Sequence, residues 1–128
     1  MIVKEGRNKI LKAIQEGTAI TFPKVILSYN DALTVAETSD ITIGAGEYEI
    51  TSPTIEFQYP GGDEETDDPR IKVTIDTSEM EQEEVAKISS IKLVGQIGAE
   101  QFLFSRIVFQ EYTKSSNSNY KFIYYIYF

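Results

Sequence analysis

The stretch IKLVGQIGAEQFLFSRIVFQE, residues 91–111, decides the fold class of this chain. Two runs rich in β-branched and aromatic residues, 91–97 and 101–111, flank the short segment GAE. Such residues favour strands, and glycine accepts the left-handed backbone conformation that a tight hairpin turn needs. The stretch therefore predicts a β-hairpin with Gly98 in its tight loop.

Segments before this hairpin also have the composition of strands. The segment TAITFPKVILSY, residues 18–29, is rich in β-branched and aromatic residues, and Pro23 within it predicts an edge strand or a bulge. The segment ITIGAGEYEI, residues 41–50, predicts a strand that is bent at Gly44 and Gly46.

Two further segments alternate apolar and polar residues with the period of a half-buried strand. In residues 53–59, one face carries Ile55, Phe57 and Tyr59. In residues 70–76, the residues that we expect to point inward are Ile71, Val73 and Ile75. The intervening segment PGGDEETDDP, residues 60–69, combines turn residues with like charges and predicts a loop.

Residues 4–16 are predicted to form the clearest helix of the chain. Apolar residues at spacings of three and four define one stripe: Ile10, Leu11 and Ile14, with Val3 and the stem of Arg7 behind them. Gly17 follows at the position where a left-handed residue commonly ends a helix.

Residues 77–90 have a weaker helical pattern. Ser78 is followed three residues later by Glu81, which resembles a capping box, and good helix formers come next. Val85 and Ile88 supply only a short apolar stripe. We therefore expect one or two helical turns here, as an insertion between strands.

These elements combine into one predicted domain over residues 1–128. A helix within residues 1–17 is followed, over residues 18–128, by an antiparallel β-sandwich of about seven strands with a short helical insertion and the acidic loop. The leading helix is expected to cover one end or one face of this mostly β fold.

The residue types that the chain lacks exclude several kinds of catalysis. It contains no histidine, no cysteine and no tryptophan. Zinc sites built from Cys or His, disulfides, and Ser-His-Asp or Cys-His nucleophiles are therefore excluded. We expect no catalytic residue, no cofactor and no metal, and hence a protein that is not an enzyme.

Hydropathy and charge limit the partners. No apolar run reaches the roughly 18 residues of a membrane span, and charges interrupt the N-terminal stretch where a signal peptide would be apolar, so we expect a product made in the cytoplasm. The net charge is −8, and residues 63–84 hold ten acids against two bases, whereas phosphate-backbone binding needs a basic face. We expect neither a nucleic acid nor a membrane as partner, and no small-molecule ligand.

The acidic loop has the one cluster of side chains that resemble metal ligands. Carboxylates of Asp63, Glu64, Glu65, Asp67 and Asp68 could supply hard oxygens to Ca²⁺. The stretch lacks the alternating acids, central glycine and distal glutamate of an EF-hand, so a solvated charged loop is the favoured interpretation.

The segment YKFIYYIYF, residues 120–128, predicts a last strand with two apolar faces. One face consists of Tyr120, Phe122, Tyr124, Ile126 and Phe128 and is expected to join the core. The other consists of Lys121, Ile123, Tyr125 and Tyr127 and has the composition of a protein contact. We predict a protein interface at Lys121, Ile123, Tyr125, Tyr127 and Phe128; the alternative is a central strand that its own domain covers on both faces.

Three segments resemble the tail-collar and tail-fibre proteins of tailed bacteriophages. The opening is similar through Gly6, Arg7, Ile10, Ala13, Gly17, Ile20, Phe22 and Val25. The predicted hairpin is similar through Ile88, Ile91, Leu93 and Phe102 to Phe104, and YTKSSNSNYKFIYYIYF resembles the close of those proteins. The chain departs from them at SYNDA, where the family often has a turn resembling Gly-Asp-Gly.

The resemblance implies a structural part of a virion: a tail, collar, baseplate or fibre-attachment protein that works as a homo-oligomer with other virion proteins. It implies no catalytic residues. The alternative function is a β-sandwich binding module that recognises carbohydrate or a host surface, with Ca²⁺ in the acidic loop.

Overall fold

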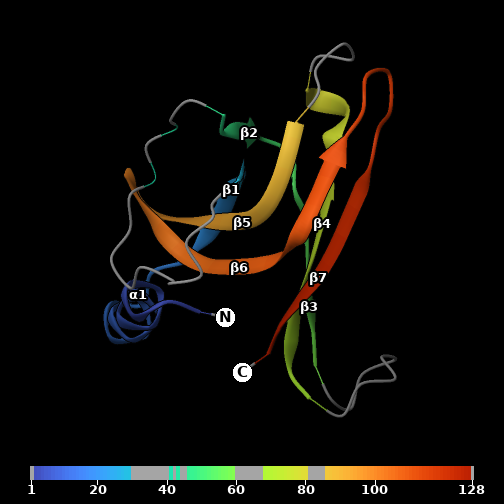
Figure 1. Cartoon of the computed structure of the whole chain (residues 1–128). Coiled ribbons are helices and arrows are strands. Elements are labelled where there is room, and N and C mark those ends of the chain that lie inside the picture. Colours follow the sequence, from blue (N-terminus) through green and yellow to red (C-terminus); the bar gives the residue numbers. More distant parts are fainter. Residues whose placement is uncertain are drawn as a thin grey trace.

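The computed structural model describes residues 2–29, 41, 43, 46–59, 68–80 and 86–127. Its elements, in chain order, are α1 (Lys4–Glu16), β1 (Thr21–Ser28), β2 (Tyr48–Ile50), β3 (Thr54–Gln58), β4 (Arg70–Asp76), the 3-10 turn η1 (Thr77–Glu79), β5 (Ala86–Ile97), β6 (Glu100–Lys114) and β7 (Lys121–Tyr127). Figure 1 shows the helix beside a mostly β body, so the predicted fold class is confirmed.

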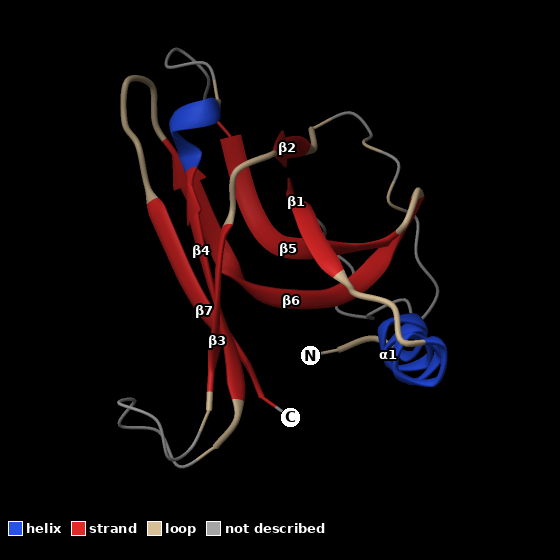
Figure 2. Cartoon of the chain, turned by 180° about the vertical axis from the view of Figure 1, so that it is seen from behind, coloured by secondary structure: helices blue, strands red, loops and turns tan. Residues whose placement is uncertain are grey.

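The seven strands form two antiparallel sheets, which Figure 2 shows from behind. The four-stranded sheet has the order β2-β1-β5-β6 and the three-stranded sheet the order β3-β4-β7. A single apolar core lies between them, with contributions from Val25, Leu27, Ile50, Ile71, Val73, Ile75, Ile91, Leu93, Phe104 and Ile126. The inward direction predicted for Ile71, Val73 and Ile75 is therefore confirmed, since each is at most 2% exposed.

The predicted hairpin is present and longer than expected. β5 and β6 pair from Ile97–Glu100 to Ala86–Lys114, and Gly98 in the connection has the left-handed φ of 59°. The pairing shifts register between Ile88 and Ser90 and between Leu93 and Val94. Such bulges bend a sheet. Figure 1 shows the result: both strands curve, and the second half of β6 runs beside β7.

The helical turns predicted over residues 77–90 are present only in part. In the described residues of this segment, 77–80 and 86–90, helical structure is limited to the 3-10 turn η1, and β5 already begins at Ala86, so Ile88 lies in a strand. The cap is Asp76, whose carboxylate accepts a 2.9 Å hydrogen bond from the Ser78 N–H. Ser78 is therefore inside the turn instead of capping it, and Glu81 lies outside the described residues.

The bulge predicted at Pro23 is confirmed, whereas the edge position is not. β1 lies between β2 and β5, and its register with β5 shifts between Thr21 and Lys24. β2 pairs only with Val25 to Leu27, so at the proline β5 is the one described neighbour of β1, and Pro23 removes no ladder bond between β1 and β2. The predicted bend at Gly46 fits its φ of 75°, and Gly44 lies outside the described residues.

β3 has the predicted alternation but not the expected burial. Phe57, on the core side, is 53% exposed, and Tyr59 beyond the strand is 65% exposed. Gln58, on the opposite side, is buried, and its Oε1 accepts a 2.5 Å hydrogen bond from Arg70 Nε. The cause is the position of β3 at the end of its sheet, where nothing among the described strands covers the far side of the Phe57 ring.

The predicted helix is present and ends as expected at Gly17, whose φ is 67°. Its buried stripe differs from the prediction: Gly6 and Ala13 are buried, whereas Leu11 and Ile14 are 68% and 74% exposed. The N–H of Val3 donates a 3.1 Å hydrogen bond to the Phe104 carbonyl. This bond brings the first turn so close to β6 that a Cβ at Gly6 would lie 2.3 Å from the Phe104 oxygen. Glycine therefore sets which side of the helix faces the sheet.

Replacing Gly6 by alanine is expected to destabilise the protein. Alanine favours a helix interior over glycine by about 1 kcal/mol, but a methyl group that meets a backbone oxygen costs about 1–3 kcal/mol. We expect the urea midpoint of Gly6→Ala to fall, while Asn8→Ala on the exposed side of the same helix leaves it unchanged or slightly raised. A Gly6→Ala protein as stable as wild type would show that α1 does not rest on the Phe104 carbonyl.

Candidate assembly surface

The last strand has the two faces that the sequence predicts. Phe122 and Tyr124 are half-buried and Ile126 is buried, whereas the residues between them are exposed. We call the exposed set the β7 outer face; it consists of Lys121, Ile123, Tyr125 and Tyr127. Ile123 and Tyr127 are 52% and 56% exposed. Phe128, the fifth predicted interface residue, lies outside the described residues.

β4 supplies a polar row beside this face. Arg70, Lys72, Thr74 and Asp76 stand directly opposite Tyr127, Tyr125, Ile123 and Lys121 in the antiparallel register. The guanidinium carbon of Arg70 lies 4.3 Å from the centre of the Tyr125 ring, a cation–π distance, while its Nε donates to Gln58. The Tyr125 and Tyr127 rings are 6.3 Å apart. These contacts therefore restrict the position of the Tyr125 ring on the surface.

Arg70 is a residue of this surface that the sequence did not point to. It stands some fifty positions before Tyr125 in the chain, and only the antiparallel pairing of β4 with β7 brings the two side chains together. Alternation identifies a face of a strand but not its neighbour in the sheet.

β7 is the end strand of the three-stranded sheet, and no described strand pairs with its outer edge. Among the described strands, β7 therefore does not have the central position of the alternative interpretation. Natural edge strands commonly carry proline, bulges or several charges that discourage further pairing. β7 contains no proline, its register with β4 is regular, and its one charge is Lys121 at the first position.

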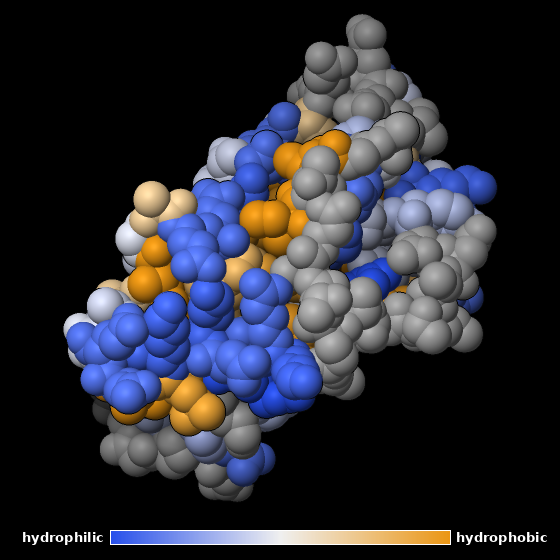
Figure 3. All heavy atoms as spheres, turned by 90° about the vertical axis from the view of Figure 1, so that its left-hand side faces the viewer, coloured by the Kyte–Doolittle hydropathy of each residue, from blue (hydrophilic) through white to orange (hydrophobic). Residues whose placement is uncertain are grey.

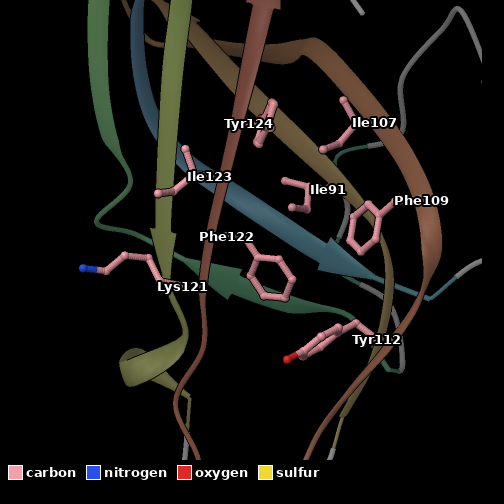
Figure 4. A pocket seen from close by; sticks show the side chains of 8 residues that line it. All are labelled: Ile91, Ile107, Phe109, Tyr112, Lys121, Phe122, Ile123 and Tyr124. Carbon is pink, nitrogen blue, oxygen red and sulfur yellow. The ribbon is translucent and has the colours of Figure 1, made fainter.

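A groove of about 500 Å³ separates β7 from the second half of β6, as the close view in Figure 4 shows. Phe122 projects from β7 and Phe109 and Tyr112 from β6 into the space between the strands. The Phe122 ring centre lies 6.0 Å from that of Phe109 and 5.7 Å from that of Tyr112. We call this space the edge groove; it is lined by Ile91, Ile107, Phe109, Tyr112, Lys121, Phe122, Ile123 and Tyr124.

Two buried hydroxyls lie beside the edge groove. Neither Tyr124 OH nor Ser105 Oγ makes a hydrogen bond to the described residues, although both atoms are shielded from water. Burial raises the pKa of Tyr124, and the neighbouring Ser105 hydroxyl offsets part of the rise. The Ser105 hydroxyl thus compensates only part of the desolvation cost of the Tyr124 hydroxyl.

Tyr124→Phe is expected to change stability little near neutral pH, by no more than about 1 kcal/mol, because the deleted hydroxyl makes no well-formed hydrogen bond to the described residues. The pH dependence of the unfolding free energy is expected to change more. The folded protein holds the phenol proton above the ordinary pKa of 10.0, so wild-type stability falls as pH rises above 10. Between pH 8 and 11, the unfolding free energy should decline less steeply for Tyr124→Phe than for wild type. Equal slopes would contradict a raised pKa of Tyr124 in the folded protein.

Of the carboxylates in the acidic loop and in residues 77–90, the structure describes those of Asp68 and Glu79. Glu79 accepts hydrogen bonds from the Thr51 N–H (2.8 Å) and the Ser52 hydroxyl; the latter is the main cause of its lowered pKa. It ties η1 to the connection between β2 and β3. Within the described ranges, no three His, Cys, Asp or Glu side chains are grouped as a metal would require. The other acidic residues of these two segments lie outside those ranges: Asp63, Glu64, Glu65, Asp67, Glu81, Glu83 and Glu84.

A second apolar surface lies on α1. Leu11 and Ile14 protrude from the helix, and Figure 3, which views the molecule from the α1 side, shows hydrophobic atoms interrupting a hydrophilic surface. Beneath the helix, a small apolar depression of about 170 Å³ is lined by Ile10, Ile20, Phe22, Phe57, Ile71 and Phe104. No helix in the described part of the chain has the length and apolar character needed to cross a membrane.

No family model matches this chain, and neither a curated protein nor a solved structure matches it.

Proposed function

We propose that this chain is a non-enzymatic structural protein that acts by assembling with other chains, as a component of a bacteriophage virion. The observation that carries the proposal is the β7 outer face, where Ile123, Tyr125 and Tyr127 are exposed on an end strand whose outer edge pairs with no described strand. Tyrosine and isoleucine at the centre of a contact, with a lysine at its rim, match the anatomy of protein interfaces.

The energetics indicate how large the contact must be. Burying a whole large apolar side chain contributes about 1.5–3 kcal/mol, so the half-exposed residues of the β7 outer face contribute about 1 kcal/mol each. Association costs about 4–15 kcal/mol in lost freedom. Ile123, Tyr125 and Tyr127 therefore do not suffice by themselves, and a stable assembly needs a second contact or several copies. The exposed Leu11 and Ile14 of α1 offer such a contact.

The virion assignment comes from the resemblance of the opening, hairpin and closing segments to phage tail-collar and tail-fibre proteins. Two conformational features are compatible with it: the helix that ends at the left-handed Gly17, and the hairpin that turns at Gly98. Under this proposal the partners are copies of the chain and neighbouring virion proteins.

The assembly proposal predicts that charges on the β7 outer face dissociate the oligomer. The double variant Tyr125→Lys, Tyr127→Lys is expected to remain folded, because both rings point away from the core, and to shift the mass of the native particle to that of the monomer. Light scattering at several concentrations, with circular dichroism for the fold, measures both. The matched control Gln15→Lys adds the same charge per site on an exposed helix position and should leave the mass unchanged.

Leu11→Lys with Ile14→Lys tests the second contact in the same assay. A wild-type chain that stays monomeric at high concentration would contradict the proposal that the chain forms a homo-oligomer. A double β7 variant that still assembles like wild type would contradict the proposal that the β7 outer face is the contact.

A further inference from the structure

The connection between β2 and β3 carries the chain from the four-stranded sheet to the three-stranded sheet. β2 ends at Ile50 and β3 begins at Thr54, so residues 51–53 make the crossing. Figure 2 shows this connection passing η1 at one end of the two sheets. Pro53 has no N–H, so the hydrogen-bond donors of the connection belong to Thr51 and Ser52.

Within the described residues, the hydrogen bonds of Thr51 and Ser52 end at one carboxylate, that of Glu79. Its Oε2 accepts from the Thr51 N–H at 2.8 Å and from the Thr51 hydroxyl at 3.0 Å, and its Oε1 accepts from the Ser52 hydroxyl. Thr51 and Ser52 are exposed, so burial contributes little to holding them. The crossing is therefore held mainly by a group that can lose its charge.

η1, which carries Glu79, is fixed on its other side by contacts that do not titrate. The Thr77 N–H donates to the Tyr120 carbonyl at 3.0 Å, and the Thr77 hydroxyl accepts from the Tyr120 N–H at 2.8 Å. Thr77 and Met80 are buried. We therefore expect η1 to stay in place when Glu79 becomes neutral.

β2 adjoins this tie and has few other contacts to hold it. It pairs only with Val25 to Leu27 of β1, and of its three residues Ile50 alone is buried. Short strands with few buried contacts open locally at a lower free energy than the core of a domain. Release of residues 51–52 is therefore expected to reach β2 first.

Hydrogen bonds keep Glu79 ionised. The Ser52 hydroxyl is the main cause of its lowered pKa, followed by the Thr51 N–H, and no described charge is among the causes. A lowered pKa means that the stabilisation is present above the ordinary value of 4.5 and is lost as pH falls through the lowered value. A neutral carboxyl group accepts hydrogen bonds about half as strongly as a carboxylate.

The charged groups on the adjoining described elements have neighbours of their own. They are Asp76, which accepts from the Ser78 N–H at 2.9 Å, Glu49, which pairs with Lys24 at 3.2 Å, and Lys121, which stands opposite Asp76 in the register of β4 and β7. Residues 51–53 contain no titratable side chain. Among these described groups, Glu79 is thus the one whose protonation weakens the bonds to the connection.

We propose that Glu79 is an acid-sensitive switch: its ionised carboxylate holds residues 51–52, and its protonation releases this connection and β2 before the rest of the sandwich unfolds. The inference is independent of the proposed assembly, because it concerns contacts within one chain. It assigns to η1 the role of a fixed support and to β2 that of the element that moves.

Amide hydrogen exchange of the full chain tests this release residue by residue. The measured quantity is the protection factor of the Thr51 N–H divided by that of the Val73 N–H, which lies in the middle strand of the three-stranded sheet. This ratio separates local release from a loss of global stability. We expect it to fall at least about tenfold between pH of about 6 and pH of about 3, as the loss of a hydrogen bond to a charged group predicts.

The variant Glu79→Gln keeps one carbonyl acceptor but has no charge at any pH. We expect its ratio near pH ~6 to resemble the acid value of wild type and to change little on acidification. The matched control Glu100→Gln removes another exposed carboxylate, which pairs with Lys9 Nζ at 2.5 Å, and should respond like wild type.

Two results would overturn the proposal. One is a wild-type ratio that is the same at both pH values. The other is a Glu79→Gln protein that keeps the full acid response, because the response would then belong to other carboxylates, such as those of Glu81, Glu83 and Glu84.

Discussion

The pairing of β5 with β6 is the interaction on which the rest of the structure depends. β5 also holds β1, so the four-stranded sheet is organised around it, and β6 provides the carbonyl on which α1 rests. The two register shifts bend the hairpin, and this bend carries the second half of β6 toward β7 without letting them pair. An unbent hairpin of the same length would not bring these two sheet edges face to face.

The features that could be predicted from the sequence are those that a few neighbouring residues determine. Gly98 and Gly17 adopt left-handed conformations because turns and helix ends need them locally. Ile71, Val73 and Ile75 point inward because alternation fixes the two faces of a strand, and the same rule gave the correct faces of β7.

The features that could not be predicted depend on contacts between distant residues. The buried side of α1 is set by the close approach of Gly6 to Phe104. The more apolar residues Leu11 and Ile14 are therefore exposed. Residues 86–90 have moderate helix propensity but pair with β6, and tertiary pairing overrode the local pattern. The contact of Arg70 with Tyr125 and the edge groove both require the strand order, which alternation does not contain.

Among the described residues, the end strands of the two sheets differ in how their edges are protected. β2 is three residues long, β3 follows Pro53 and carries Glu56, and the middle of β6 is covered by the N-terminal segment. Of the described strands, β7 alone combines seven regular residues, aromatic side chains on both faces and an edge that no other described strand covers. Ile123 and Lys121 belong both to the β7 outer face and to the edge groove. A partner that buries the β7 outer face at these two residues would therefore also cover the adjoining wall of the edge groove.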